Sequence, residues 1–388
     1  MLHNYNAFFY PRQLFLTQFV KNSCKFPENA LYLSCLRVAR ICFATNLTQR
    51  IRNLAIMKVW QLAYPHNLQR VLSPDLKLDL DKVKVKITKA LLTESDVAVY
   101  TGAIKVKTPF IPGRFAIGQV TEANEDSFIK KGERVYLAGV TEDELSTSGL
   151  KIAGETADGF YRDFCLAGVD DVYPLPASVS DEAAFLIDAI ALAERVVDEM
   201  QLSVGQHVLV LGGGLYANVL CQILIYHRAV PILADNNAER LTRAKRSGIY
   251  YTFPNDETLK NNVLNVTGGK LADGAVYLTY GNRCEPSVIF PLVKRDSCVT
   301  FCAPTCKSLP VNLEYALKNN VTIKGITESR EYVSTAINLL ANKAVNFAEF
   351  PYASYKEEQL PALMEKYAAI LGSGANLPEQ MDVIKFIF

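Results

Sequence analysis

A glycine-rich segment between an apolar run and a helical pattern carries the clearest chemical signal in the sequence. In HVLVLGGGLYANVLCQ, residues 207–222, Gly212, Gly214 and Ala217 fit the spacing G-x-G-x-x-G/A. The first glycine permits a tight turn, the second lets a pyrophosphate approach the backbone, and the small third residue keeps the helix close to the sheet. Amides at the helix start would face the phosphates. The spacing therefore predicts a dinucleotide site.

A carboxylate further along the chain bears on which dinucleotide binds. Asp235 ends the next predicted strand, 21 residues beyond Gly214, where it can accept hydrogen bonds from a ribose. Because a carboxylate repels a 2′-phosphate and no Arg follows directly, NAD(H) is favoured; Arg240 and Arg243 keep NADP(H) open. The predicted coenzyme-binding residues are Gly212, Gly213, Gly214, Leu215, Tyr216, Ala217, Asp235, Asn236 and Thr279.

Two regions with different secondary-structure patterns flank this loop and must position it. From Met57 to about Pro176, short alternating runs separated by Gly and Pro predict a β-rich region. A helix is predicted from Ser180 to about Met200, and strands then alternate with helices. The predicted strands are 208–211, 231–235, 250–253, 274–279, 298–302 and 322–326. Such alternation indicates a doubly wound parallel sheet, and the terminal run VIKFIF is expected to return to the first region.

The charge balance excludes some partners. The 388 residues carry 41 Lys and Arg against 40 Asp and Glu, a formal charge of +1. This lacks the dense basic field of non-specific nucleic-acid binding, so no nucleic-acid partner is predicted. Residues 1–56 are basic, with net charge +6, and the remainder has net charge −5. Residues 1–56 have the composition of a transit peptide or are an extension upstream of a misplaced start, and they lack a membrane-spanning apolar run.

Histidine and cysteine are sparse and scattered. The chain has four His and nine Cys, with no CxxC pair. Since His is the usual acid–base group and metal ligand, a bound cofactor is expected to supply chemistry. Reduced thiols and a cytoplasmic location are predicted. Cys298, Cys302 and Cys306 recur every four residues, but the run CVTFC favours a buried strand over a metal site.

Five further segments, taken in order with the glycine loop, resemble a known family. They are SDVAVYTG at 95–102, PGRFAIGQV at 112–120, KKGERVYL at 130–137, DGFYRDFCLAGVDDVYPLP at 158–176 and ADNNAERLTRAKRSG at 234–248. The order resembles the medium-chain dehydrogenase/reductase family, the superfamily of zinc-type alcohol, polyol and threonine dehydrogenases. The resemblance covers 57–388. It implies an α/β fold in which a Rossmann domain, 184–327, is inserted in a β-rich, chaperonin-10-like (GroES-like) catalytic domain, 57–183 and 328–388, after the extension 1–56.

The resemblance also locates where zinc ligands stand in zinc-type members. In place of a Cys, a His followed by Glu, and a Cys or acid, this sequence has Thr93, Arg114 followed by Phe115, and Asp188. Threonine is a poor ligand and a permanently cationic Arg cannot be one. Residues 138–160 also lack the Cys residues of the family's structural zinc lobe. We therefore predict no zinc of either kind.

Four residues are the catalytic candidates. Ser95 matches the hydroxyl that relays the substrate proton in the family, and Asp96 matches the neighbouring carboxylate, but the relay His is absent from 97–99. Arg114 could point into the cleft, pair with Asp188, and polarise a carbonyl or bind a carboxylate or phosphate. The alternatives are a helix-cap serine, a structural carboxylate, and an arginine that forms a surface ion pair or fills the vacated site.

These features favour a zinc-independent, NAD(H)-dependent oxidoreductase acting on a small alcohol/carbonyl pair. Zinc-free members of the family often reduce activated double bonds, so an enoyl or quinone reductase is an alternative. A nucleotide-binding protein that has lost its chemistry is another. No membrane partner is predicted, and the resemblance implies a homodimer or homotetramer formed through the Rossmann domain.

Overall fold

The computed structural model describes residues 56–142, 149–278, 286–302, 311, 313–327, 329–373 and 380–386. All of them belong to one compact unit, Ile56–Phe388. The extension up to residue 55, the coenzyme candidate Thr279 and the thiol Cys306 lie outside the described residues. Among the residues described, no helix combines the length and apolar character needed to cross a membrane.

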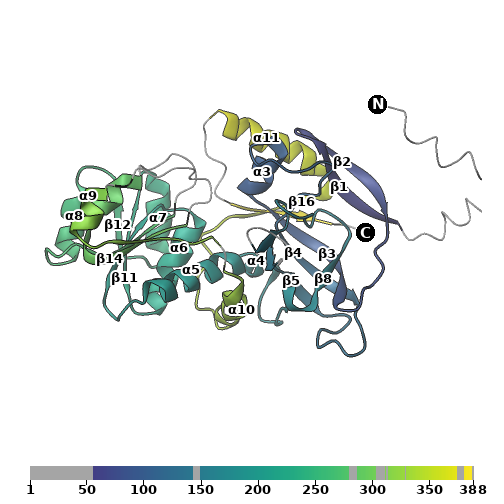
Figure 1. The fold of residues 1–388 in the computed structure, drawn as a ribbon, viewed down its shortest axis with the longest axis horizontal. Coiled ribbons are helices and arrows are strands. Elements are labelled where there is room, and N and C mark those ends of the chain that lie inside the picture. Colours follow the sequence, from purple (N-terminus) through teal and green to yellow (C-terminus); the bar gives the residue numbers. More distant parts are fainter. Residues whose placement is uncertain are drawn as a thin grey trace, which may run out of the picture. The chain divides into compact units, whose positions relative to one another are not determined.

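A seven-stranded sheet forms the β-rich part of the fold (Figure 1). Its order is β16-β17-β3-β4-β5-β9, with β8 also paired to β3. The strands are β3 (Lys82–Leu92), β4 (Phe115–Glu122), β5 (Arg134–Leu137), β8 (Phe164–Gly168), β9 (Val172–Pro174), β16 (Tyr352–Lys356) and β17 (Met381–Lys385). The C-terminal strand β17 pairs antiparallel with β3, so the last part of the chain does return to the first sheet.

Smaller elements flank this sheet. β1 (Ile56–Tyr64) and β2 (Asn67–Pro74) form an antiparallel hairpin, and β6 (Val140–Glu142) pairs with β7 (Leu150–Ile152). Helix α3 (Glu94–Thr101) packs against α11 (Leu360–Gly372) in one hydrophobic core. The 3₁₀ turns are η1 (Val169–Asp171), η2 (Pro286–Leu292), η3 (Arg330–Tyr332) and η4 (Glu357–Gln359).

A six-stranded parallel sheet follows in the order β12-β11-β10-β13-β14-β15. In chain order this is 3-2-1-4-5-6, the doubly wound arrangement with a nucleotide crevice at its switch point. The strands are β10 (His207–Leu211), β11 (Val230–Asp235), β12 (Tyr251–Pro254), β13 (Ala272–Tyr277), β14 (Val293–Phe301) and β15 (Thr322–Gly325). The predicted doubly wound sheet, placed in the chain between two parts of the first sheet, is confirmed.

Helices cover both faces of this sheet because its central strand is apolar on both sides. Val208 and Val210 share a core with α5 and α6, whereas Leu209 and Leu211 pack with α8 and η2. The helices are α4 (Asp181–Ala184), α5 (Ile187–Met200), α6 (Leu215–Tyr226), α7 (Ala238–Arg246), α8 (Leu259–Val266), α9 (Leu313–Lys318) and α10 (Val333–Ala341).

The single helix predicted over residues 180–200 is divided in the structure. Ser180 caps α4 by accepting the Ala183 amide, as its side chain predicts. The amide of Leu186 then bonds three residues back, to the Ala183 carbonyl, and α5 begins only at Ile187. This tight turn lets Phe185 and Leu186 both enter the core, which a continuous helix pattern does not reveal.

Candidate active site

The glycine loop joins β10 to α6 as predicted. Gly212 has φ 116°, a left-handed value that favours glycine, and its amide bonds to the Ala234 carbonyl on the neighbouring strand. A Cβ on Gly213 would lie 2.9 Å from the Cβ of Arg240 and 3.1 Å from that of Asp235. A Cβ on Gly214 would meet nothing within 4 Å. A side chain at Gly213 would therefore meet Arg240 and Asp235, whereas the space beside Gly214 is free of protein atoms. A phosphate fits in that free space beside Gly214.

The start of α6 provides donors beside that open position. Gly214 is the N-cap, and the first helical hydrogen bond is made by the Asn218 amide to the Gly214 carbonyl. The amides of residues 215–217 precede this bond and carry the positive end of the helix dipole. Ala217 is fully buried against the sheet, as a small third residue should be. The helix start can thus hold the pyrophosphate of a dinucleotide.

Asp235 organises the loop through hydrogen bonds within the protein. Its Oδ2 accepts the Gly213 amide at 2.6 Å, and its Oδ1 accepts the Asn237 amide at 2.7 Å. Arg240 donates from Nη1 to Oδ2 at 3.3 Å. A carboxylate has about four acceptor positions, so one remains for a ribose hydroxyl. Sequence reasoning predicted the ribose contact but not these bonds to the loop.

The two arginines that kept NADP(H) open have partners within the protein. Arg240 is 5% exposed and forms an ion pair with Asp235. The guanidinium carbon of Arg243 lies 5.7 Å from the centre of the Phe350 ring, a cation–π contact. Asn236, the remaining coenzyme candidate on this loop, is exposed. These placements favour a ribose over a 2′-phosphate beside Asp235.

Ser95 and Asp96 lie at the start of α3. Thr93 is the N-cap, and it forms a capping box with Asp96, whose Oδ2 accepts the Thr93 amide at 2.8 Å and the Thr93 hydroxyl at 2.5 Å. Asp96 Oδ1 accepts the Gly113 amide at 2.9 Å. Burial raises the pKa of Asp96, and these hydrogen bonds oppose the rise. The contacts favour the structural alternative for Asp96.

The half-buried Ser95 hydroxyl extends this network toward the surface. Its Oγ lies 3.1 Å from the Thr93 Oγ1. Since Thr93 donates its own proton to Asp96, Ser95 is the donor in that contact. The pattern T-x-x-D at 93–96 is a capping-box signature that sequence analysis could have read.

Arg114 precedes β4 and pairs with an acid that sequence analysis missed. Its Nη1 donates to Glu155 Oε1 at 2.8 Å, and the two side chains are 17% and 19% exposed. The guanidinium also lies over the Phe115 ring, 5.4 Å from its centre. Glu155 is 41 residues away in sequence, and no short-range pattern connects the two. The arginine is therefore a largely buried, charge-neutralised group.

Asp188, in the first turn of α5, contacts the coenzyme-loop helix. Tyr216, the second residue of α6, donates its hydroxyl proton to Asp188 Oδ2 at 2.8 Å. The prediction that Tyr216 contacts the coenzyme concerns its amide at the start of α6, and its side chain is bonded to this carboxylate. The bond links the helix that begins at the glycine loop to the residue predicted at the family's third ligand position.

A small cavity lies beside these groups. Its volume of about 10 Å³ is that of roughly one water. Three parts of the chain line it: the end of β5 with the residues after it, the start of α5, and the segment that leads into α10. The lining residues are Tyr136, Ala138, Gly139, Val140, Asp188, Ser329, Arg330 and Val333. Arg114 is adjacent, since a Cβ on Gly139 would come within 3.0 Å of its Cγ. The cavity thus adjoins two of the predicted catalytic residues.

The residues at the three family positions do not fit zinc. The Thr93 hydroxyl is given to Asp96, and the Arg114 guanidinium is a donor paired with Glu155. Only Asp188 has ligand chemistry, and a zinc site needs at least three protein ligands. In the part of the chain that is described, no three His, Cys, Asp or Glu side chains gather as a metal site would require. Cys298 and Cys302 pack in one apolar core, as the strand interpretation predicted.

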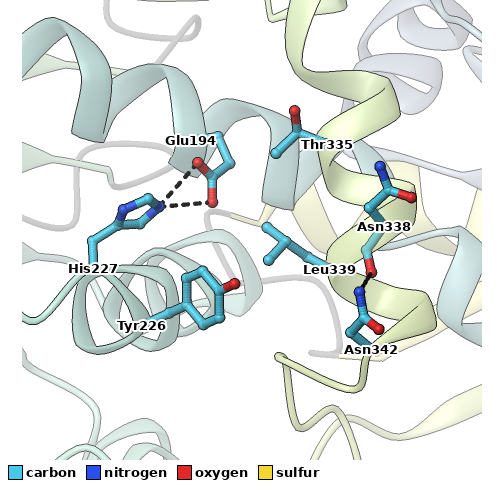
Figure 2. Close-up of a pocket in the computed structure, with 7 residues that line it drawn as sticks. All are labelled: Glu194, Tyr226, His227, Thr335, Asn338, Leu339 and Asn342. Atoms are coloured by element: carbon cyan, nitrogen blue, oxygen red, sulfur yellow. Dashed lines mark hydrogen bonds and ion pairs between the residues drawn. The ribbon is translucent and has the colours of Figure 1, made fainter.

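A larger cavity of about 240 Å³ lies elsewhere (Figure 2). Tyr226 and His227, at the C-terminal end of α6, face Glu194 of α5 and residues of α10. His227 Nε2 lies 3.1 Å from both Glu194 oxygens. Because α6 has 12 residues, this cavity is roughly 18 Å from Gly214 along the helix axis. It is therefore separate from the coenzyme loop.

Comparisons with known proteins agree with this geometry. Residues 79–177 match the family model of the alcohol dehydrogenase GroES-like domain. The chain is 25% identical over 277 residues to the starvation-sensing protein RspB of Escherichia coli K12, covering 68% of this chain and 78% of that protein. It is 24% identical over 281 residues to a sorbitol dehydrogenase of Halalkalibacterium halodurans, covering 68% and 82%.

A solved structure shows the same fold. The alcohol dehydrogenase RspB of Escherichia coli CFT073, in complex with NADH, superposes with a TM-score of 0.74 at 19% identity, covering 86% of this chain and all of that one. The matched domain, these relatives and the doubly wound sheet together support a member of the medium-chain dehydrogenase/reductase family, similar to the alcohol and polyol dehydrogenase-like oxidoreductases.

Proposed function

We propose that this protein is a zinc-independent, NAD(H)-dependent oxidoreductase that interconverts a small alcohol and the corresponding carbonyl compound. The observation that carries the proposal is the open space at Gly214, at the start of α6, beside the Asp235 carboxylate. Phosphates fit the helix amides and the ribose fits the carboxylate. A bound nicotinamide supplies or accepts the hydride.

The polar groups around the small cavity favour an uncharged substrate. Arg114 and Glu155 form a neutral pair, and Asp188 carries a negative charge that the Tyr216 hydroxyl stabilises. The carbonyl or hydroxyl oxygen of an uncharged substrate can form hydrogen bonds with groups of these kinds. The proposal therefore assigns Arg114 and Asp188 to orient a neutral substrate.

The function is tested by turnover on three classes of acceptor: simple carbonyl compounds, enones and quinones. We expect NADH oxidation with carbonyl compounds, and NADH binding in a titration of nucleotide fluorescence. Turnover confined to enones or quinones would identify the reductase alternative. Binding without turnover on any class would support a nucleotide-binding protein instead and contradict the proposed reaction.

Removal of metal ions provides a prediction specific to zinc independence. Because Thr93 and Arg114 cannot act as ligands, treatment with 1,10-phenanthroline should leave carbonyl turnover unchanged. Metal analysis of the untreated protein should find far less than one zinc per chain. A zinc-type sorbitol dehydrogenase treated in parallel shows that the chelator is effective. Loss of turnover that added zinc restores would refute the prediction.

The choice of coenzyme gives a second prediction. In Asp235→Ser the repulsion toward a 2′-phosphate is removed and Arg240 loses its partner. We expect NADPH to bind about tenfold more tightly and NADH about tenfold more weakly, each about 1.4 kcal/mol. Glu239→Ser, which removes an exposed acid from the first turn of α7, is the matched control and should change neither affinity. An unaltered NADH/NADPH ratio in Asp235→Ser would count against the ribose contact.

Assembly and location follow from two further observations. β15 is an edge strand of the six-stranded sheet and Ile323 on it is 40% exposed, while Leu313 and Leu317 on α9 are 63% and 73% exposed. These apolar groups support the homodimer or homotetramer that the resemblance implies. Cys165, Cys221 and Cys302 are buried free thiols, which are compatible with the reducing cytoplasm proposed as the location.

A further inference from the structure

Tyr136 on β5 is a buried residue that lines the small cavity. Its neighbours Val135 and Leu137 point into the core shared by β3 and α3, whereas Tyr136 points the opposite way, into the core that contains α5. The side chain is 2% exposed and lines the cavity together with Asp188. Strand alternation therefore places the Tyr136 side chain in the core that contains α5, beside Asp188 at the small cavity.

The charges around Tyr136 keep its hydroxyl protonated. Burial, and then the negative charge of Asp188, raise the pKa of Tyr136 well above its usual value, and Arg114 opposes this rise. The other polar residues at the cavity are Ser329 and Arg330, and Arg330 pairs with Asp171 at 2.8 Å. A phenol held in its neutral form is a permanent hydrogen-bond donor.

The cavity is connected to the coenzyme loop through two side chains. Asp188 lines the cavity and accepts the hydroxyl proton of Tyr216, which stands two residues beyond Gly214. The cavity is about the size of one oxygen atom or water. It can therefore admit the oxygen of a substrate whose carbon lies toward the coenzyme.

We propose that Tyr136 is a catalytic residue that donates a hydrogen bond to the substrate oxygen and supplies its proton; this rests on the proposed carbonyl reductase function. The carbonyl carbon accepts hydride from the reduced nicotinamide, and the C=O π electrons pass to oxygen. The oxygen takes the Tyr136 proton, giving the alcohol, and the phenolate regains a proton from water. Donors aimed at developing negative charge are among the largest contributions to catalysis.

The test compares Tyr136→Phe with the wild type. Phe has nearly the same shape and lacks only the hydroxyl, so we expect kcat for carbonyl reduction to fall about 100-fold while NADH affinity stays unchanged. Tyr100→Phe is the matched control: that tyrosine is also buried, but its hydroxyl bonds to Glu365, and its kcat should match the wild type.

The outcomes separate the two proposals. If the wild type reduces carbonyl compounds and Tyr136→Phe does so at a similar rate, the role of Tyr136 is refuted and the function stands. If the wild type reduces none, the function fails, and the role of Tyr136 fails with it. Should Tyr136→Phe not fold, Ala138→Val decides: it keeps the hydroxyl and fills the cavity, so kcat/KM should fall at least about tenfold. An unchanged kcat/KM in this variant refutes the role of Tyr136.

Discussion

Replacing Asp96 by Ala is expected to destabilise the protein by about 4 kcal/mol. The change leaves two buried amides, those of Thr93 and Gly113, and the Thr93 hydroxyl without their acceptor. Each such group costs about 1–3 kcal/mol, and the helix cap is lost as well. Urea unfolding, followed by the fluorescence of Trp60, measures the loss of stability. Trp60 is the single tryptophan and lies in the same hydrophobic core as α3.

Two comparisons make the Asp96 result specific. Ser180→Ala removes a cap that accepts only the Ala183 amide, so it should cost about 1 kcal/mol. Asp96→Asn keeps one acceptor oxygen for Gly113 and should lie between the two. An Asp96→Ala variant that unfolds near the wild-type urea concentration but has lost turnover would reverse the interpretation and make Asp96 a catalytic group.

Replacing Gly214 by Val is expected to weaken NADH binding about a thousandfold, or about 4 kcal/mol. The protein itself has room there, since nothing lies within 4 Å of a Cβ at Gly214. The added carbons would fill the space we assign to the pyrophosphate, and two or more charge-assisted hydrogen bonds from the start of α6 would be lost. Titration of nucleotide fluorescence measures the change.

Gly325→Val is the matched control for Gly214→Val. Gly325 lies on β15, is exposed, and also has nothing within 4 Å of a Cβ. Valine is favoured in strands, so NADH affinity and melting temperature should both stay close to the wild-type values. Gly214→Val should melt only slightly earlier, because an N-cap tolerates valine at a cost of about 1 kcal/mol. NADH binding that survives in Gly214→Val would place the phosphates elsewhere.

The parallel sheet could be predicted because its signals are local. Each strand is a short apolar run, and each following helix changes the hydrophobic period from 2 to 3.6. The glycine loop and Asp235 are also readable, since their roles depend on spacing within one strand–helix–strand unit. What the pattern did not predict was the break between α4 and α5, because burial of Phe185 and Leu186 depends on the whole core.

The candidate site was less predictable because its pairs join distant segments. Arg114 meets Glu155, and Tyr216 meets Asp188 across 28 residues. No periodicity or propensity encodes such pairs, since they form only when the strands and helices have packed. Tyr136 looked like an ordinary alternating residue of a strand. Its candidate role depends on the core that its face of β5 packs into. That core is the one that contains α5.

The pairing of β17 with β3 determines the order in which the chain can fold during synthesis. The six-stranded sheet uses one continuous stretch, from His207 to Gly325, and can form once that stretch has emerged from the ribosome. The seven-stranded sheet joins Leu92 to Asp382, so it is completed only after Asp382 has been synthesised. Contacts of such long sequence separation form slowly and leave strand edges exposed in the interval. The nucleotide-binding sheet is therefore expected to be completed first, and the sheet that carries Tyr136 is completed only when β17 pairs with β3.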